Sequence, residues 1–341
     1  MNREIVVAVD AMGADAGAEV AVLGAVQALH NSKVDRILLV GNDSQIAPLL
    51  GVQKYDKSRI EVVDAKEVIT PDEAPVAAIK AKKDSSMVVG LGLLKQGRAS
   101  AFVSAGSTGA LLTGATTIVG RIKGIKRPAL GVLLPNTTSG YTFLIDAGAN
   151  VDVRPEYLVQ FAQMGSVYME HIMGIGNPKV GLVNVGAEKE KGNALTKAAY
   201  ELLETSNVNF VGNLEARELP AGECHVAVCD GFVGNVVLKY AEGIAKGFFS
   251  MLKQELLAKF STKIGAALAK PAFKNIRDSF DYAEVGGAAF IGLNGLVIKA
   301  HGSSNAKAIM NSIKQCERFI QADVVGKIKN VIDRGDDENG I

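Results

Sequence analysis

Short apolar runs recur along the chain, and most are followed by a polar turn and then by a longer amphipathic stretch. Runs this short and this apolar are typical of strands that are buried on both faces of a parallel sheet. We therefore predict strands at residues 5–9, 37–40, 60–63, 101–103, 129–134, 142–145, 180–183, 210–211, 226–229 and within 290–299.

Amphipathic stretches lie between these strands. The spacing of their apolar residues predicts helices at 20–29, 87–94 and 155–173, and two more that begin after residue 109 and near residue 194. Strands that alternate with helices predict a three-layer α/β/α architecture built on a mainly parallel sheet. The runs 129–134 and 142–145 are separated only by PNTTSG, which indicates a hairpin and therefore an antiparallel insertion.

Residues 236–281 show no strand pattern. Their apolar spacing predicts two helices around a break at Ser261 and Thr262, which together would form a hairpin that projects from the core. At 341 residues the chain exceeds the usual size of a one-core domain. This length suits either one large α/β unit with an appended piece or two lobes that share a sheet. We predict the first, a single large α/β domain over residues 1–341 that carries this hairpin.

Composition narrows the class of protein. A net charge of +1 gives no overall electrostatic reason to expect a nucleic-acid partner. Three cysteines are too few for a disulfide framework, and the Cys224, His225 and Cys229 group lacks the second ligand pair of a zinc site, so we expect no metal. No signal peptide and no apolar run of about 18 residues are found. We expect a cytoplasmic protein, with peripheral contact at the inner face of the cell membrane left open.

Polar residues directly follow five of the predicted strands: Asp10, Ser104, Asp146, Asn184 and Asp230. Ligands of open parallel sheets bind at the carboxyl ends of the strands, so we expect these turns to converge on a binding site. For any single turn, the alternative is ordinary loop chemistry such as a helix cap.

The segment VGLVNVGAEKEKGN, residues 180–193, combines a strand, a polar turn and a helix start. First-turn N–H groups of a helix favour an anion, so Lys191 would face a phosphate group there. The alternative is a solvated loop lysine. SAGSTG at 104–109 is a second candidate anion turn, in which Ser107 either contacts a ligand or caps the next helix.

The sequence leaves the roles of two further side chains open. Asn235 either caps the helix that follows Asp230 or points its amide into the site. His301 is either catalytic or a packed or capping histidine. No P-loop and no GxGxxG turn occurs in the candidate loops, which weakens a nucleotide-binding interpretation.

The chain resembles the acyl-carrier-protein-dependent phosphate acyltransferases of bacterial phospholipid synthesis, the PlsX type. The resemblance covers nearly the whole chain and is carried by AVDAMGADAG, KKDSSM, SAGSTGALL, RPALGVLLP, DAGANVD, GLVNVGAEKEKGN, FVGNLEAREL, VCDGFVGNVVLK and GGAAFIGLNGLVIKAHGSS. The chain departs from the family pattern at Ala14, Ala18, Ser107 and Ala187, where the family usually has Gly, Pro, Asn and Glu.

The resemblance implies transfer of a fatty acyl group from acyl-acyl-carrier protein to inorganic phosphate, without a cofactor. Lys191 and Asn235 are then the expected catalytic residues. The expected substrate-binding residues are Asp10, Gly13, Ser104, Gly106, Ser107, Thr108, Asp146, Asn150, Glu188, Gly192, Asn193, Asp230 and His301.

The resemblance also implies a fold like that of isocitrate and isopropylmalate dehydrogenases, and a homodimer. The hairpin tip mixes apolar and cationic residues, which suits an anionic membrane surface, and the alternative is that it only packs in the dimer. The expected membrane contacts are Leu256, Leu257, Phe260, Ile264 and Leu268. The densest basic cluster is the one expected to dock the acidic carrier protein, namely Arg121, Lys123, Lys126 and Arg127.

Two other functions remain as alternatives. An NAD-dependent decarboxylating dehydrogenase of the same fold group would need magnesium-binding aspartates and a nucleotide pocket, an arrangement that the chain does not show. A non-enzymatic, membrane-associated scaffold for carrier protein, working with or without a membrane glycerol-3-phosphate acyltransferase, would leave the clustered strand-end turns unexplained.

Overall fold

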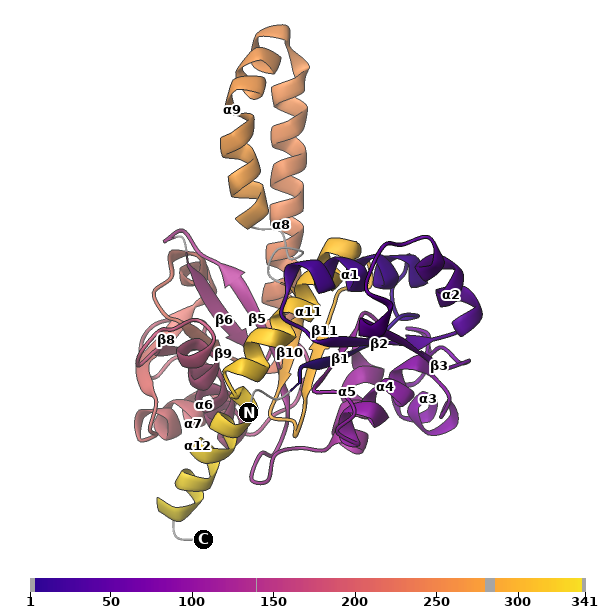
Figure 1. Ribbon diagram of the computed structural model, residues 1–341. Helices are drawn as coiled ribbons and strands as arrows, with labels where there is room; N and C mark the ends of the chain where they lie inside the picture. Colours follow the sequence, from indigo (N-terminus) through magenta and orange to yellow (C-terminus); the bar gives the residue numbers. More distant parts are fainter. Residues whose placement is uncertain (1–3, 139, 280–285, 339–341) are drawn as a thin grey trace.

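The computed structural model describes residues 4–138, 140–279 and 286–338. Within these ranges eleven strands form one sheet in the order β3-β2-β1-β4-β11-β10-β5-β6-β9-β7-β8 (Figure 1). The strands are β1 (Val6–Asp10), β2 (Arg36–Gly41), β3 (Ile60–Asp64), β4 (Ala101–Ser104), β5 (Ala129–Pro135), β6 (Tyr141–Ile145), β7 (Lys179–Asn184), β8 (Asn209–Glu215), β9 (Val226–Val228), β10 (Ala288–Ile291) and β11 (Leu296–Lys299).

The sheet is mostly parallel with an antiparallel part, as predicted. Strands β3, β2, β1, β4 and β11 pair in parallel, and so do β6, β9, β7 and β8. The predicted hairpin is formed by β5 and β6. The pattern did not separate a second hairpin, β10 and β11, from the single run 290–299, and β10 is antiparallel to both of its neighbours.

Helices cover both faces of the sheet, which confirms the three layers. They are α1 (Ala18–Asn31), α2 (Asp43–Gly51), α3 (Pro75–Ala81), α4 (Ser86–Lys95), α5 (Thr108–Gly114), α6 (Pro155–His171), α7 (Ala194–Glu204), α8 (Gly231–Ala258), α9 (Phe260–Ser279), α11 (Ala306–Gln321) and α12 (Val324–Glu338). Short 3-10 helices span Lys57–Arg59 and Ala216–Ala221, and a π-helical turn spans Ala115–Val119.

Alternate residues of β1 show why the layers form. Val7 and Val9 pack in a core with α1, α6, α11 and α12, whereas Val6 and Ala8 pack in a second core with α4 and α5. Successive side chains of a strand point to opposite faces, so a strand that is apolar at every position needs helices on both sides.

The helical hairpin is formed by α8 and α9, which project well beyond the sheet (Figure 1). The turn between them is at Lys259, two residues before the predicted break. Residues 280 and 281 of the predicted hairpin lie outside the described ranges. Among the described helices, none combines the length and apolarity needed to cross a membrane.

The direction of the strands corrects one expectation. Because the pairing between β11 and β6 reverses direction three times, β6, β9 and β7 run opposite to β1 and β4. The carboxyl ends that carry Asp146, Asn184 and Asp230 therefore point the opposite way from those that carry Asp10 and Ser104. The five strand-end turns do not share one edge of the sheet.

Candidate functional site

The first group of site residues lies at the ends of β1 and β4. The hydroxyl of Ser104 donates to Oδ2 of Asp10 at 2.6 Å and accepts from the backbone N–H of Gly106 at 3.0 Å. Asp10 and Ser104 are almost completely buried. Gly13 packs directly against this group, since a Cβ at this position would lie 2.6 Å from Oδ2 of Asp10 and from the nitrogen of Gly106. The structure thus brings four predicted residues together.

The next two predicted residues of this turn begin α5. The hydroxyl of Ser107 accepts from the N–H of Ala110 at 3.4 Å, which makes Ser107 the N-cap, and Thr108 is the first residue of the helix. The capping alternative for Ser107 therefore holds, since its hydroxyl is engaged by the helix.

Cationic groups stand beside this first group. Lys299, at the end of β11, donates from Nζ to the backbone carbonyls of Ala105 and Ala300. Burial lowers the pKa of Lys299 to about 8, and the nearby Lys239 acts in the same direction. Desolvation of the ring, followed by the charge of Lys239, lowers the pKa of His301. Sequence reasoning considered only His301 in this region, although Lys299 ends a strand as the five polar residues do.

The second group is organised by Asp146, which is fully buried. Its Oδ1 accepts from the backbone N–H groups of Leu130, Gly148 and Ala149, at 3.0, 3.1 and 2.8 Å. Its Oδ2 accepts from both the backbone and the side-chain nitrogen of Asn150, each at 2.7 Å. Burial raises the pKa of Asp146, and the donors around it act in the opposite direction. The carboxylate therefore shapes the loop that follows β6.

Helix α8 begins against this loop. Asp230 caps the helix by accepting from the N–H of Val233 at 2.9 Å. Asn235 is consequently a residue of the helix interior, and the alternative that it caps the helix is wrong. Its side chain packs on Gly148, where an added Cβ would lie 3.3 Å from the Oδ1 of Asn235. Asn235 is exposed on its other side.

The third group is the turn between β7 and α7. Asn193 accepts from the N–H of Thr196 at 2.9 Å, and the Thr196 hydroxyl accepts from the N–H of Asn193 at 3.0 Å, so the two form a capping box. Gly192 has a φ of 103°, and a Cβ there would lie 2.1 Å from the Thr196 hydroxyl. Lys191 and Glu188 are exposed in this turn.

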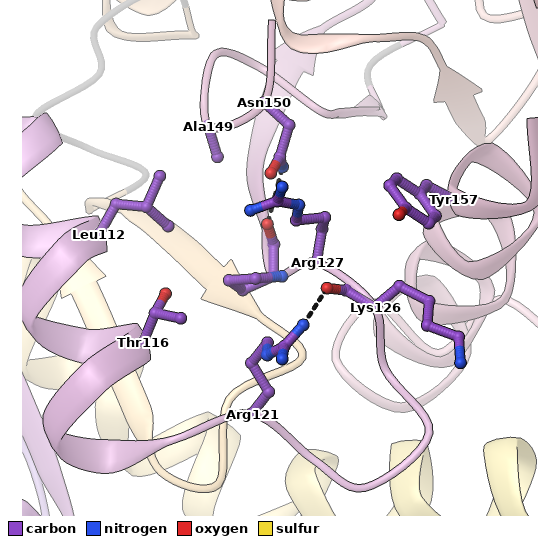
Figure 2. Close-up of a pocket in the computed structure, with 9 residues that line it drawn as sticks. Leu112, Thr116, Arg121, Lys126, Arg127, Ala149, Asn150 and Tyr157 are labelled. Carbon is purple, nitrogen blue, oxygen red and sulfur yellow. Dashed lines mark hydrogen bonds between the residues drawn. The ribbon is translucent and has the colours of Figure 1, made fainter. Parts of the chain in front are cut away.

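A pocket of about 440 Å³ adjoins the second group (Figure 2). Three of the four basic residues of the predicted docking cluster line it, and Lys123 does not. Sequence reasoning did not connect Asn150 with this cluster. The lining residues are Leu112, Thr116, Arg121, Lys126, Arg127, Pro128, Ala149, Asn150 and Tyr157.

Helix α8 links the first two groups. Its residue Asn235 contacts Gly148 of the second group, and one turn later Lys239 interacts electrostatically with Lys299 and His301. The third group adjoins the second because β9 lies between β7 and β6, with Val228 opposite both Leu182 and Ile145. Among the described residues, no hydrogen bond or ion pair joins Lys191 to Asn235.

The hairpin tip exposes large apolar side chains. Phe260 and Leu268 are each 81% exposed, Leu257 and Ile264 are about half exposed, and Leu256 is partly covered. The described residues contain no cluster of three or more His, Cys, Asp or Glu side chains arranged to hold a metal ion.

Solved structures define the class of fold. The chain is similar to a phosphotransacetylase from Streptococcus pyogenes, with a TM-score of 0.61 at 18% identity, over 94% of this chain and 95% of that one. It is also similar to a 4-hydroxythreonine-4-phosphate dehydrogenase from Klebsiella pneumoniae, with a TM-score of 0.54 at 12% identity, over 94% and 100% of the two chains. These similarities establish the fold.

Sequence comparisons then identify the family. A family model described as fatty acid synthesis protein matches residues 5–327, so the chain belongs to that family. A phosphate acyltransferase of Clostridium botulinum is 51% identical over 326 residues, which cover 96% of this chain and 97% of the relative. One of Clostridium perfringens is 50% identical over 334 residues, 98% of each chain. The resemblance inferred from the motifs is confirmed.

Proposed function

We propose that the protein transfers a fatty acyl group from acyl-carrier protein to inorganic phosphate and releases an acyl phosphate for phospholipid synthesis. The observation that carries this proposal is that about half of the residues are identical, over nearly the full length, to those of proteins described as phosphate acyltransferases. A phosphate oxygen attacks the thioester carbonyl, the C–O bond forms, the C–S bond breaks and the carrier thiolate leaves. The phosphate is the nucleophile, so the enzyme supplies position and charge stabilisation.

Lys191 and the start of α7 hold the attacking phosphate in this proposal. Support comes from the helix N-terminus, whose N–H groups favour an anion, and from the exposed ammonium beside it. The side-chain oxygen of Asn193 is engaged in the cap, so its contribution is to fix the backbone N–H groups of the first turn.

Asn235 stabilises the thioester oxyanion together with N–H groups of the glycine turns. Its position on α8, with its side chain against Gly148 of the Asp146 loop, supports this role. Asp10, Gly13, Ser104, Gly106, Thr108 and His301 line the facing part of the substrate site, which α8 connects to Asn235 through Lys239.

The decisive assay incubates the protein with long-chain acyl-carrier protein and phosphate, without metal, and measures phosphate-dependent release of the carrier thiol. Lys191→Ala and Asn235→Ala should each lower turnover strongly while the circular dichroism spectrum is unchanged. Lys189→Ala is the matched control, since Lys189 lies in the same turn but pairs with Glu204 at 2.6 Å. Near-normal turnover in Lys191→Ala or Asn235→Ala would remove that residue from the mechanism.

The same assay separates the alternatives. Reduction of NAD without thiol release would favour a decarboxylating dehydrogenase, and carrier binding without either reaction would favour a scaffold. We also propose that the fold belongs to the isocitrate and isopropylmalate dehydrogenase group, in line with the dehydrogenase among its structural neighbours.

The helical hairpin forms a homodimer contact in this proposal. Along α8 large apolar side chains recur every three or four residues on the exposed surface, a stripe suited to packing against another helix. These residues are Val236, Tyr240, Ile244, Phe248 and Met251. Analytical ultracentrifugation of Tyr240→Glu should show a monomer, and an unchanged dimer would exclude the stripe as the contact.

The hairpin tip contacts the inner face of the cell membrane, where a glycerol-3-phosphate acyltransferase can receive the product. Support comes from the exposed Leu257 and Phe260 next to lysines such as Lys259 and Lys263. A Leu257→Glu, Phe260→Glu variant should lose flotation with anionic liposomes. Unchanged flotation would leave the tip with a packing role only. The protein otherwise resides in the cytoplasm.

The basic loop 121–127 docks the acidic carrier protein. Its four cations, Arg121, Lys123, Lys126 and Arg127, are all exposed, which suits electrostatic steering of an acidic partner. A steep rise in the KM for acyl-carrier protein with ionic strength is the expected signature.

A further inference from the structure

The pocket beside the basic loop contains positive charge that the protein itself does not neutralise. Arg121 donates to the backbone carbonyl of Lys126 and so closes the loop. Arg127 extends toward Asn150 in Figure 2, and among the described residues it makes no hydrogen bond or ion pair. None of the nine described residues that line the pocket is acidic. An exposed guanidinium that lines a pocket without a counter-charge favours an anionic ligand, and its planar donors match a phosphate group.

The size and the walls of the pocket describe the rest of the ligand. About 440 Å³ lies within the usual range of about 300–1,000 Å³ for small-molecule sites and is much larger than a single phosphate ion needs. Leu112, Pro128 and Tyr157 give it apolar surface, which contributes nothing to the binding of inorganic phosphate. The lining therefore suits a phosphate ester that carries an organic chain.

The pocket also lies next to the proposed reaction centre. The side-chain nitrogen of Asn150 donates to the carbonyl of Pro128 at 2.8 Å and to Asp146 at 2.7 Å, which leaves its oxygen for the cavity. Two residues earlier, Gly148 contacts Asn235. Two residues of chain span at most about 7 Å, so a ligand chain that leaves the pocket along this loop arrives at Asn235.

We propose that this pocket binds the phosphate group of the prosthetic arm of the acyl donor, a phosphodiester joined to an amide-containing pantetheine chain. Arg127 and Arg121 pair with the phosphate, the oxygen of Asn150 accepts from an amide of the arm, and the thioester end extends along the loop toward Asn235. This inference rests on the proposed acyl transfer and names the part of the donor that the pocket recognises.

Calorimetric titration with 4′-phosphopantetheine and with pantetheine tests the pocket without any turnover. The wild type should bind the phosphorylated compound at least about tenfold more tightly, the size expected for a charge-assisted hydrogen bond. Arg127→Gln should bring the ratio of the two affinities close to one, and Arg127→Lys should restore part of it. Lys123→Gln removes the same charge from the same loop without touching the pocket, so it should keep the wild-type ratio.

Equal affinities in the wild type, or an unchanged ratio in Arg127→Gln, would overturn the proposal. A kinetic arm distinguishes the other source of phosphate. With Arg127→Gln, the KM for acyl-carrier protein should rise while the KM for inorganic phosphate stays the same, and the reverse result would assign the pocket to the attacking phosphate and overturn the proposal. Failure of the acyl-transfer function is seen separately, as absence of phosphate-dependent thiol release by the wild type.

Discussion

The substitution Asp146→Asn tests how far one buried carboxylate holds the site together. All five groups that surround Asp146 are donors, so only an ionised carboxylate can accept from all of them. Asparagine has one side-chain oxygen. If it faces Leu130, Gly148 and Ala149, the new NH₂ group faces the two donors of Asn150.

The expected loss follows from that count. Two hydrogen bonds to a charged group are removed, each worth about 1.5–3 kcal/mol, and two donors are left buried against another donor. We expect the free energy of unfolding to fall by about 3–5 kcal/mol, the range measured when one partner of a buried charged contact is removed. The loop that carries Gly148 and Asn150 should loosen, so turnover should fall even under conditions where the variant is folded.

Urea denaturation followed by circular dichroism measures the stability, and thiol release measures the turnover. Asp152→Asn, the same chemical change at an exposed position six residues further on, is the control and should match the wild type in both. An Asp146→Asn variant whose unfolding free energy lies within about 1 kcal/mol of the wild type would refute the reasoning, because it would show that the five bonds do not depend on the charge.

Three further outcomes follow from single residues. Gly192→Ala places a Cβ 2.1 Å from the Thr196 hydroxyl at a φ of 103°, so urea denaturation should show a loss of about 1–3 kcal/mol, and a neutral effect would contradict the strain. Asn193→Asp keeps a good N-cap but adds a negative charge, so stability should hold while the KM for phosphate rises. Because burial lowers the pKa of Lys299 from 10.5 to about 8, the unfolded chain binds more protons between these values. The unfolding free energy of the wild type minus that of Lys299→Met should therefore increase by up to about 3 kcal/mol between neutral pH and about pH 10.5. A difference that does not change with pH would show that the ammonium is not desolvated.

Most strands, the helices α1, α4, α5, α6 and α7, and the projecting hairpin could be predicted from the sequence because each has a local cause. Helices α2, α3, α11 and α12 were not predicted. Asp10 marks the end of β1 because five apolar residues precede it, and the turn at Lys259 lies two residues before the break predicted at Ser261 and Thr262. The antiparallel position of β10 could not be predicted, since its residues and those of β11 form one apolar run and pairing depends on contacts distant in sequence.

The structure brings some of the predicted site residues into contact, but their arrangement differs from the one that the sequence led us to expect. Asp10 and Ser104 do meet, because β1 and β4 are parallel neighbours. Asp146 and Asp230 belong to strands of the opposite direction, which no local pattern reveals. The sequence did not mark Lys299 as a candidate site residue, because its pKa is lowered by burial in the folded protein and not by its neighbours in sequence.

The reversal of strand direction gives α8 a specific part in the site. If all the strands were parallel, their turns would meet at one edge and no connecting element would be needed. In this fold α8 starts in contact with the Asp146 loop, where a Cβ on Gly234 would lie 1.9 Å from the Asp146 carbonyl, and it reaches Lys299 and His301 through Lys239 little more than one turn later. The same helix continues into the hairpin proposed for dimer and membrane contact. A tilt of α8 would therefore move Asn235 and Lys239 together, so we expect a partner bound to the hairpin to change the geometry of the proposed reaction centre.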